Sequence, residues 1–339
     1  MTAADGTPAE RAHVLATAAR AGDRRALARL LTGVENHTRT AELALRALYP
    51  DAAASHLVGI TGPPGAGKST LVAALIAELR GRGRTVAVVA VDPSSPITGG
   101  ALLGDRVRMQ SYAADDGVFI RSMASRGHAG GLSSTSAAAA SVLAASGFDY
   151  VLLETVGTGQ SEVEVAAAAD TTVVLEAPEM GDEVQAIKAG LLEVADIVVV
   201  NKGDRPGAQR TAAQLRAMLT PSAAETHADS ADGPAPSPRR GPQPRHPEIL
   251  VTTAATGDGV PALLDAVIRH REEGVDGVTR VARRGRAAAQ LRALVAERTW
   301  ARLDDPAHQA LVEQVVDEVA AHTLDPYAAA DRLLAALHP

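Results

Sequence analysis

The residues LVGITGPPGAGKST, from Leu57 to Thr70, are the strongest evidence for the fold. A short apolar run at 57–60 leads into Gly62-Pro63-Pro64-Gly65-Ala66-Gly67-Lys68-Ser69-Thr70, which fills the pattern G-x-x-x-x-G-K-[ST]. In this pattern backbone N–H groups surround phosphates at a helix N-terminus, the lysine reaches the terminal phosphates, and the hydroxyl of the last residue binds Mg²⁺. We therefore expect residues 62–70 to bind a nucleotide, with Lys68 as a catalytic residue and Ser69 as a metal ligand.

A second motif, Asn201-Lys202-Gly203-Asp204, follows the apolar run 197–200 and sets the choice of base. The carboxylate of Asp204 can accept hydrogen bonds from the N1–H and the 2-amino group of guanine, which adenine does not offer. Lys202 can lay its aliphatic stem on the base. After the next apolar run, the turn at Thr252-Thr253-Ala254 can present an N–H group to the guanine O6. The motif predicts GTP as the nucleotide.

A carboxylate follows the apolar run 150–153, in the sequence Glu154-Thr155-Val156-Gly157. Many GTPases carry D-x-x-G here, and glutamate is one methylene longer. We expect Glu154 to meet Mg²⁺ through water or to orient the attacking water, and Gly157 to donate its N–H to the γ-phosphate.

Two more aspartates are candidate metal ligands. Asp92 ends the run 86–91 and should face the same Mg²⁺ edge of the sheet. Asp105 follows a glycine-rich loop together with Arg106 and Arg108. These three are either switch residues, with Asp105 near the metal, or a solvated helix face.

The distribution of apolar residues indicates an α/β fold. Short apolar runs alternate with helix-like stretches, which predicts a mostly parallel sheet covered by helices on both faces. The seven expected strands lie at 57–60, 86–91, 118–120, 150–153, 172–175, 197–200 and 249–251.

Three regions are expected along the chain. Residues 1–54 form a helical extension, with a break near Gly22-Asp23; residues 55–273 form the P-loop domain; residues 274–339 form a C-terminal helical arm. The stretch 222–247 is rich in Pro, Ala, Ser and charge, and is predicted to be a disordered insertion. Helices are expected near 261–273, 285–303, 307–323 and 326–337.

Composition restricts the partners. No apolar run approaches the roughly 18 residues that span a bilayer, and the first 25 residues lack the features of a signal or transit peptide, so we expect a cytoplasmic protein without membrane insertion. Without cysteine, any metal must be held by oxygen or imidazole. The net charge of -7 argues against a nucleic-acid partner. Among 33 basic residues only Lys68, Lys188 and Lys202 are lysines, which marks Lys188 as a third candidate for a role that arginine does not fill.

Beyond the short nucleotide motifs, long stretches of the chain resemble one family, the G-protein chaperones of the MeaB or ArgK type that are associated with methylmalonyl-CoA mutase. The resemblance covers nearly the whole chain apart from 222–247. It is carried by DPSSPITGGALLGDRVRMQ (92–110), IRSMASRGHAGGLS (120–133), ETVGTGQSEVEVA (154–166), GDEVQAIKAGLLEVADIVVVNKGDRPGA (181–208) and DPYAAADRLL (325–334).

The resemblance implies a homodimeric GTPase of the MinD-like (SIMIBI) class with a C-terminal dimerisation arm. It also implies a partner, a cobalamin-dependent acyl-CoA mutase, for which the protein gates adenosylcobalamin loading and which it protects or reactivates. Residues 181–188 correspond to the third switch of the family, so Lys188 is expected to enter the site when the mutase binds. Three features depart from the family pattern: Gly203 stands where alanine is usual, Ser133 to Ser136 differ, and the 222–247 insertion is long.

Other functions remain open at this stage. ArgK-type sequences were once labelled kinases that phosphorylate a periplasmic binding protein, but the chain carries no kinase catalytic loop. A nickel-delivery GTPase needs a metal store, whereas this chain has no Cys and scattered His; a signal-recognition GTPase needs a Met-rich domain, and only five Met are present. The client could be a methylmalonyl-, isobutyryl-, ethylmalonyl- or hydroxyisobutyryl-CoA mutase.

Overall fold

The computed structural model describes residues 6–92, 112, 114–124, 134–155, 168–178, 192, 194–219, 247–273 and 278–337. Three candidate residues, Asp105, Gly157 and Lys188, lie outside the described residues, as do 222–246 of the expected insertion and the side chain of Asp92. The chain divides into two compact units, one up to Arg280 and one from Val281, and each is described by itself.

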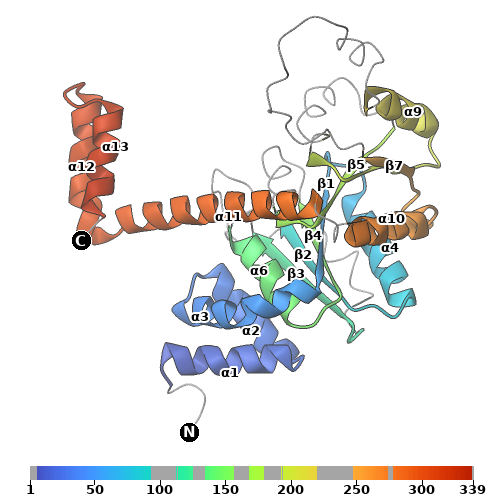
Figure 1. Cartoon of the computed structure of the whole chain (residues 1–339), viewed down its shortest axis with the longest axis horizontal. Helices are drawn as coiled ribbons and strands as arrows, with labels where there is room; N and C mark the ends of the chain where they lie inside the picture. The colour runs from blue at the N-terminus through green and yellow to red at the C-terminus, as the bar shows by residue number, and fades with distance from the viewer. Residues whose placement is uncertain are drawn as a thin grey trace, which may run out of the picture. The chain divides into compact units, whose positions relative to one another are not determined.

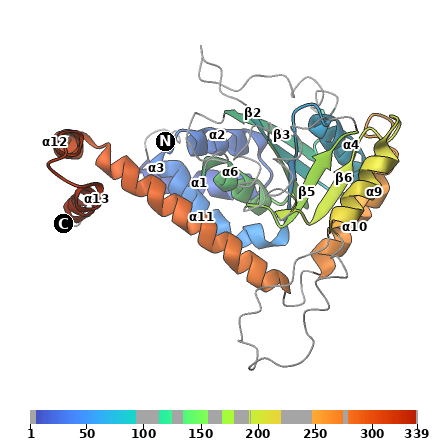
Figure 2. The ribbon, with the colours of Figure 1, turned by 90° about the horizontal axis from the view of Figure 1, so that it is seen from above.

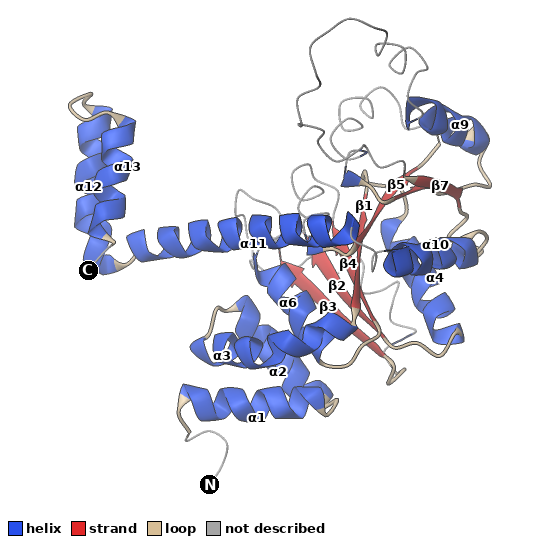
Figure 3. Ribbon diagram, in the orientation of Figure 1, coloured by secondary structure: helices blue, strands red, loops and turns tan. Residues whose placement is uncertain are grey.

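The first unit is built on a seven-stranded sheet (Figures 1 and 3). The strand order is β3-β2-β4-β1-β5-β6-β7, and every neighbouring pair is parallel. All seven expected strands and the parallel sheet are therefore confirmed. The strands are β1 (His56–Thr61), β2 (Val86–Asp92), β3 (Val118–Ala124), β4 (Tyr150–Thr155), β5 (Thr171–Glu176), β6 (Ile197–Val200) and β7 (Glu248–Val251).

Helices cover both faces of the sheet (Figure 2). Along each strand, alternate side chains enter different cores because successive residues point to opposite faces. In β4, Leu152 joins the core formed with α4 (Lys68–Gly81) and α10 (Val260–Glu273). Val151 and Leu153 join the core on the other face, formed with α6 (Ser134–Ala145) and the N-terminal helices. A third core lies between β5, β6 and α9 (Ala208–Leu219).

The N-terminal segment forms three helices, α1 (Pro8–Arg20), α2 (Arg24–Glu35) and α3 (Arg39–Leu48), and a short 3₁₀ helix, η1 (Tyr49–Ala54). The break expected near Gly22-Asp23 is confirmed: Asp23 caps α2, and Gly22 adopts a φ of 81°. The hydroxyl of Thr38 caps α3, a helix that the apolar spacing alone did not separate from α2. Helix α1 begins with a capping box, in which the N–H and hydroxyl groups of Thr7 donate to Glu10 and lower its pKa.

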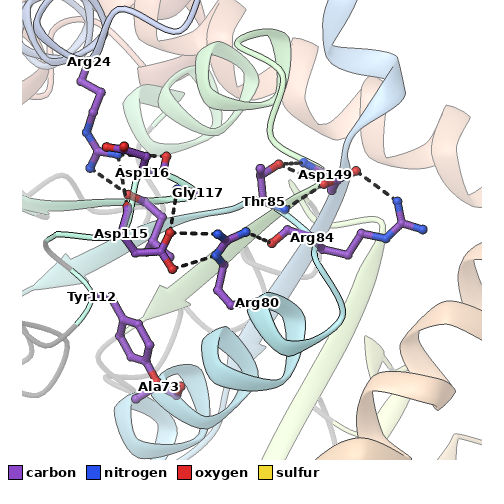
Figure 4. A network of polar contacts seen from close by, with 11 residues as sticks. Arg24, Ala73, Arg80, Arg84, Thr85, Tyr112, Asp115, Asp116, Gly117 and Asp149 are labelled. Atoms are coloured by element: carbon purple, nitrogen blue, oxygen red, sulfur yellow. Dashed lines mark hydrogen bonds and ion pairs between the residues drawn. The ribbon is translucent and has the colours of Figure 1, made fainter.

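Two arginines hold the turn before β3 (Figure 4). The guanidinium of Arg24, at the start of α2, donates to the backbone oxygens of Asp115, Asp116 and Val118 at 3.4, 3.2 and 2.8 Å. Arg80, near the end of α4, donates to both carboxylate oxygens of Asp115 at 2.8 and 2.9 Å. The N-terminal helices and the P-loop helix are thus bonded to the same turn of the sheet.

Within its described residues, the second unit has helices and no strands. It comprises α11 (Val278–Leu303), whose first turn belongs to the first unit, α12 (Pro306–Ala320) and α13 (Pro326–Ala336). Helix α11 starts seven residues earlier than the expected 285. Asp305 and Asp325 cap α12 and α13, and an ion pair of 2.8 Å joins Arg332 to Glu318. Within the described residues, no helix has both the length and the apolar character needed to cross a bilayer.

Candidate nucleotide site

The loop between β1 and α4 depends on three glycines. Gly62, Gly65 and Gly67 have φ angles of 138°, 78° and 99°, a region that favours glycine. A Cβ atom on Gly62 would lie 2.3 Å from the carbonyl oxygen of Leu175, and one on Gly67 would lie 2.4 Å from Nδ2 of Asn201. Gly62 and Gly67 are therefore required by close approach as well as by backbone conformation, whereas Gly65 is favoured by its backbone conformation alone.

Helix α4 begins directly after this loop, with Gly67 at its N-cap and Lys68 as its first residue. The first N–H groups of an α-helix lack carbonyl partners within the helix, so this end suits a phosphate. The side chain of Lys68 is 7% exposed, and its Nζ donates to the backbone oxygens of Gly62 and Pro63 at 2.7 and 3.1 Å. The ammonium group thus lies inside the loop that the sequence assigns to phosphate.

Two of the residues expected to hold Mg²⁺, Ser69 and Glu154, meet where α4 begins and β4 ends. The hydroxyl of Ser69 donates to Oε1 of Glu154 at 2.6 Å, and both side chains are buried. A hydroxyl and a carboxylate oxygen at this separation form a hard donor pair that fits Mg²⁺. Asp92 is the last residue of β2, two positions beyond Ala90, which pairs with Glu154. Within the described part of the chain there is no cluster of three or more His, Asp or Glu side chains that could hold a metal.

The base motif is bonded to the phosphate loop through Asn201. This side chain is 2% exposed; its Nδ2 donates to the backbone oxygen of Ala66 at 2.9 Å. Its Oδ1 accepts from the hydroxyl of Thr252 and from the N–H of Ala254, both at 3.1 Å. Asn201 therefore connects the loops that follow β1, β6 and β7.

Lys202 and Gly203 continue this connection. Lys202 adopts a φ of 57°, and its Nζ donates to the backbone oxygen of Gly65 at 2.7 Å. The N–H of Gly203 donates to the backbone oxygen of Thr252 at 2.9 Å. A Cβ atom on Gly203 would lie 2.8 Å from a methyl carbon of Val251, so the glycine that departs from the family pattern fits a close contact here.

The turn expected near the guanine O6 is closed by its own backbone. The N–H of Thr253 donates to the backbone oxygen of Asp258 at 2.9 Å, and a Cβ atom on Gly259 would lie 2.3 Å from the backbone oxygen of Val251. Asp204 follows on the exposed side of the motif. The predicted residues of 62–70, 201–204 and 253–254 are thus neighbours at the carboxyl edge of the sheet.

The structural role of Asn201 was missed by sequence reasoning, which assigned it only to base recognition. The three bonds of its amide depend on two loops that are distant in sequence, and the Leu175 carbonyl beside Gly62 comes from a strand without any motif. The only available signal was a polar residue placed directly after the buried strand β6.

A parallel sheet with a phosphate loop after β1 and a guanine motif after β6 defines a P-loop GTPase. Residues 27–307 match the family model described as "Methylmalonyl Co-A mutase-associated GTPase MeaB", and the chain belongs to this family. The fold class is accordingly that of the SIMIBI GTPases.

Individual relatives agree with this assignment. The chain is 44% identical to a putative GTPase of Pyrococcus horikoshii over 316 residues, which cover 92% of this chain and 94% of that protein. It is 42% identical to the mouse protein named "Methylmalonic aciduria type A homolog, mitochondrial" over 197 residues, 54% of this chain and 48% of that protein. A solved structure described as a LAO/AO transport system kinase aligns with a TM-score of 0.65 and 28% identity, over 97% of this chain and 98% of that chain.

Proposed function

We propose that this GTPase is a chaperone of a cobalamin-dependent acyl-CoA mutase: it binds the mutase, gates the loading of adenosylcobalamin, and protects or reactivates the mutase through GTP hydrolysis. The observation that carries the proposal is the match of residues 27–307 to a family described by its association with methylmalonyl-CoA mutase. The name of the mouse relative, which refers to methylmalonic aciduria, supports the same client.

The geometry of the nucleotide site suits GTP hydrolysis, which would supply the free energy for the chaperone function. The backbone of 62–70 and the ammonium of Lys68 would bind the phosphates, and Asp204 would bind guanine. Ser69, Glu154 and Asp92 would hold Mg²⁺, which when bound neutralises negative charge on the β- and γ-phosphates. The bond from Ser69 holds the Glu154 carboxylate at the end of β4, from which it could also orient the attacking water.

The helical arm from residue 274 onward is proposed to form a homodimer, with 1–54 as an extension and 55–273 as the GTPase domain. In the arm, Leu291 and Val295 are 61% and 62% exposed and lie four residues apart on α11. Residues at this spacing share one face of a helix, so they form an apolar surface that a second copy could cover.

The client can be identified by capture from the native cell. The chain is loaded with a non-hydrolysable GTP analogue, and bound proteins are identified by mass spectrometry, with a Lys68→Ala variant as the control that should not hold the analogue. Enrichment of one acyl-CoA mutase over the control supports the proposal and names the client. Absence of every such mutase, together with transfer of γ-phosphate from labelled GTP to a binding protein in a separate assay, would instead support the kinase function.

A further inference from the structure

Four side chains form a chain of polar contacts at the edge of the sheet opposite the nucleotide loops, and hydrogen bonds join three of them. Nε2 of His56, at the start of β1, lies 2.8 Å from Oγ1 of Thr171, at the start of β5. The same hydroxyl oxygen lies 2.8 Å from Nδ1 of His270 on α10. Nε2 of His270 lies 3.2 Å from Oδ1 of Asp196, directly before β6.

The centre of this chain is inaccessible to water. Thr171 is fully buried and His56 is 4% exposed, while the side chains of His270 and Asp196 are 20% and 6% exposed. Thr, His and Asp are also the residue types of a hydrolase triad, but a hydroxyl without exposure meets no substrate. The chain is therefore a buried proton site, in which every donor needs an acceptor.

The bonds determine where the protons lie when both imidazoles are neutral. The carboxylate of Asp196 only accepts, so His270 carries its proton on Nε2 and its Nδ1 accepts the hydroxyl proton of Thr171. The Thr171 oxygen then accepts from Nε2–H of His56. Each imidazole is thereby held in its Nε2–H form.

The hydrogen bonds among His56, Thr171 and His270 can accommodate one additional proton, but not two. A proton added to His270 lets Nδ1–H donate to Thr171; the hydroxyl then reverses and donates to Nε2 of His56, which moves its own proton to Nδ1. If both imidazoles were doubly protonated, both would donate to the same oxygen, the buried hydroxyl proton would lose its acceptor in the chain, and two positive charges would share one bridge.

Two carboxylates lie beside the imidazole rings of this chain. Asp196 lies 3.2 Å from this ring and also accepts the N–H of Thr172, whereas Asp170 lies 4.0 Å from Nδ1 of His56 and accepts the N–H of Leu57. Both carboxylates are thus fixed, and the nearer one faces His270.

Two arginines of α10 near the chain contact other partners. The ring of Tyr150 meets His56 edge-on at 6.0 Å, and the guanidinium of Arg271 lies over that tyrosine at 5.7 Å. Next to His270 on α10, Arg269 pairs with Glu248 of β7 at 2.9 Å.

We propose that His56, Thr171 and His270 form a pH-sensitive switch that accepts one proton and excludes a second. The first proton charges His270 and changes the tautomer of His56, which stays neutral. The switch connects the starts of β1 and β5 to α10, and Asp196 connects α10 to the start of β6. At their other ends β1 and β6 carry the phosphate loop and the base motif, and α10 follows the guanine turn.

The switch makes folding depend on pH. An unfolded chain protonates both histidines below their ordinary pKa of about 6.5, while the folded chain takes up one proton for the pair. Because the unfolded state then binds more protons, stability falls as the pH falls, and the pair lowers the folding equilibrium constant by up to about tenfold per pH unit.

Histidine NMR tests the switch directly. Long-range ¹H–¹⁵N spectra of ¹⁵N-histidine-labelled protein, saturated with GDP, are recorded between pH 8 and 5 and assigned with His56→Gln and His270→Gln. We expect both rings to be Nε2–H tautomers at pH 8. On acidification His270 should become doubly protonated while His56 changes to the Nδ1–H tautomer over the same pH range.

Variants of the bridge separate coupling from general structure. Thr171→Val removes the hydroxyl and should leave the tautomer of His56 unchanged when His270 is protonated, whereas Thr171→Ser should keep the coupled change. If Thr171→Val does not fold, the spectra of wild type and Thr171→Ser still show whether the tautomer of His56 changes together with protonation of His270. Full protonation of both rings in the folded protein, an Nδ1–H tautomer of either ring at pH 8, or no change in either ring down to pH 5 would overturn the proposal.

Discussion

The side-chain amide of Asn201 donates to the backbone oxygen of Ala66 at 2.9 Å, so the base motif and the phosphate loop are bonded to each other directly. The same side chain accepts from Thr252 and Ala254. One residue therefore bonds together the three loops that are expected to contact different parts of GTP.

Asn201→Ala should weaken GDP binding by roughly 10- to 100-fold, because loss of the amide leaves buried partners unsatisfied at about 1–3 kcal/mol. Isothermal titration calorimetry measures the effect. Gln209→Ala, an exposed amide on α9, controls for the substitution itself. Equal affinities of Asn201→Ala and wild type would show that the three loops are positioned without this bridge.

Asp204→Asn tests the choice of base. Each hydrogen bond from guanine to the carboxylate should contribute about 1.5–3 kcal/mol, so the variant should lose GTP and gain xanthosine triphosphate, which offers the complementary groups. Calorimetric titration with both nucleotides gives the answer. Unchanged GTP affinity would refute the assignment of Asp204 to the base.

Asp115 provides a pH-dependent test of the turn before β3 (Figure 4). Hydrogen bonds from Arg80, and then from the N–H of Gly117, lower the pKa of Asp115. The stabilisation is therefore present above the unfolded pKa of about 3.9, and is lost as the pH falls through the lower folded pKa. Asp115→Asn should be less stable than wild type at pH 7, with a difference that shrinks below about pH 4.

Urea unfolding between pH 7 and pH 3 measures this difference. Asp116→Asn is the matched control, since the neighbouring carboxylate is exposed and Arg24 contacts only the backbone oxygen of Asp116. A difference for Asp115→Asn that stays constant with pH would contradict the role of the ion pair.

The nucleotide loops were largely predictable, because local patterns encode them: a strand, glycines at positive φ, and a helix that begins at Lys68. The hydrogen bonds that connect separate loops were not predictable from the sequence. The bonds of Arg24 to the turn at 115–118, and of His56 to Thr171 and onward to His270, join residues about 100 positions apart. Such contacts depend on strand order, which no local spacing of these residues reveals. Helix α3 was missed for a different reason, since its start depends on the single cap at Thr38.

Substitution of the apolar face of α11 tests the proposed homodimer. Leu291→Glu with Val295→Glu should convert the dimer to a monomer without loss of GDP binding, because charges placed opposite each other in an apolar interface are costly. Light scattering after gel filtration gives the mass. Arg292→Glu, between the two positions, is the control for added negative charge on the helix. A wild-type monomer at micromolar concentration, or a double variant that remains dimeric, would contradict the proposed interface.

Lys188 is the residue through which the mutase is expected to accelerate hydrolysis. A cation moved to the developing phosphate charge contributes about 10³–10⁵ in rate, so Lys188→Ala should lose most of the stimulation while nucleotide affinity changes only a few-fold. Phosphate release at saturating mutase measures this. Lys188→Arg keeps the charge and separates its contribution from that of the lysine geometry. Equal stimulation of wild type and Lys188→Ala would exclude this role.

GTP hydrolysis by this chain is proposed to be coupled to an acyl-CoA mutase. The most direct measurement is the rate of phosphate release by the wild-type protein, alone and with a saturating concentration of each of the four candidate mutases in turn. We expect a slow rate for the protein alone and an increase of roughly tenfold or more with one of the mutases. The same rate with and without all four would contradict it.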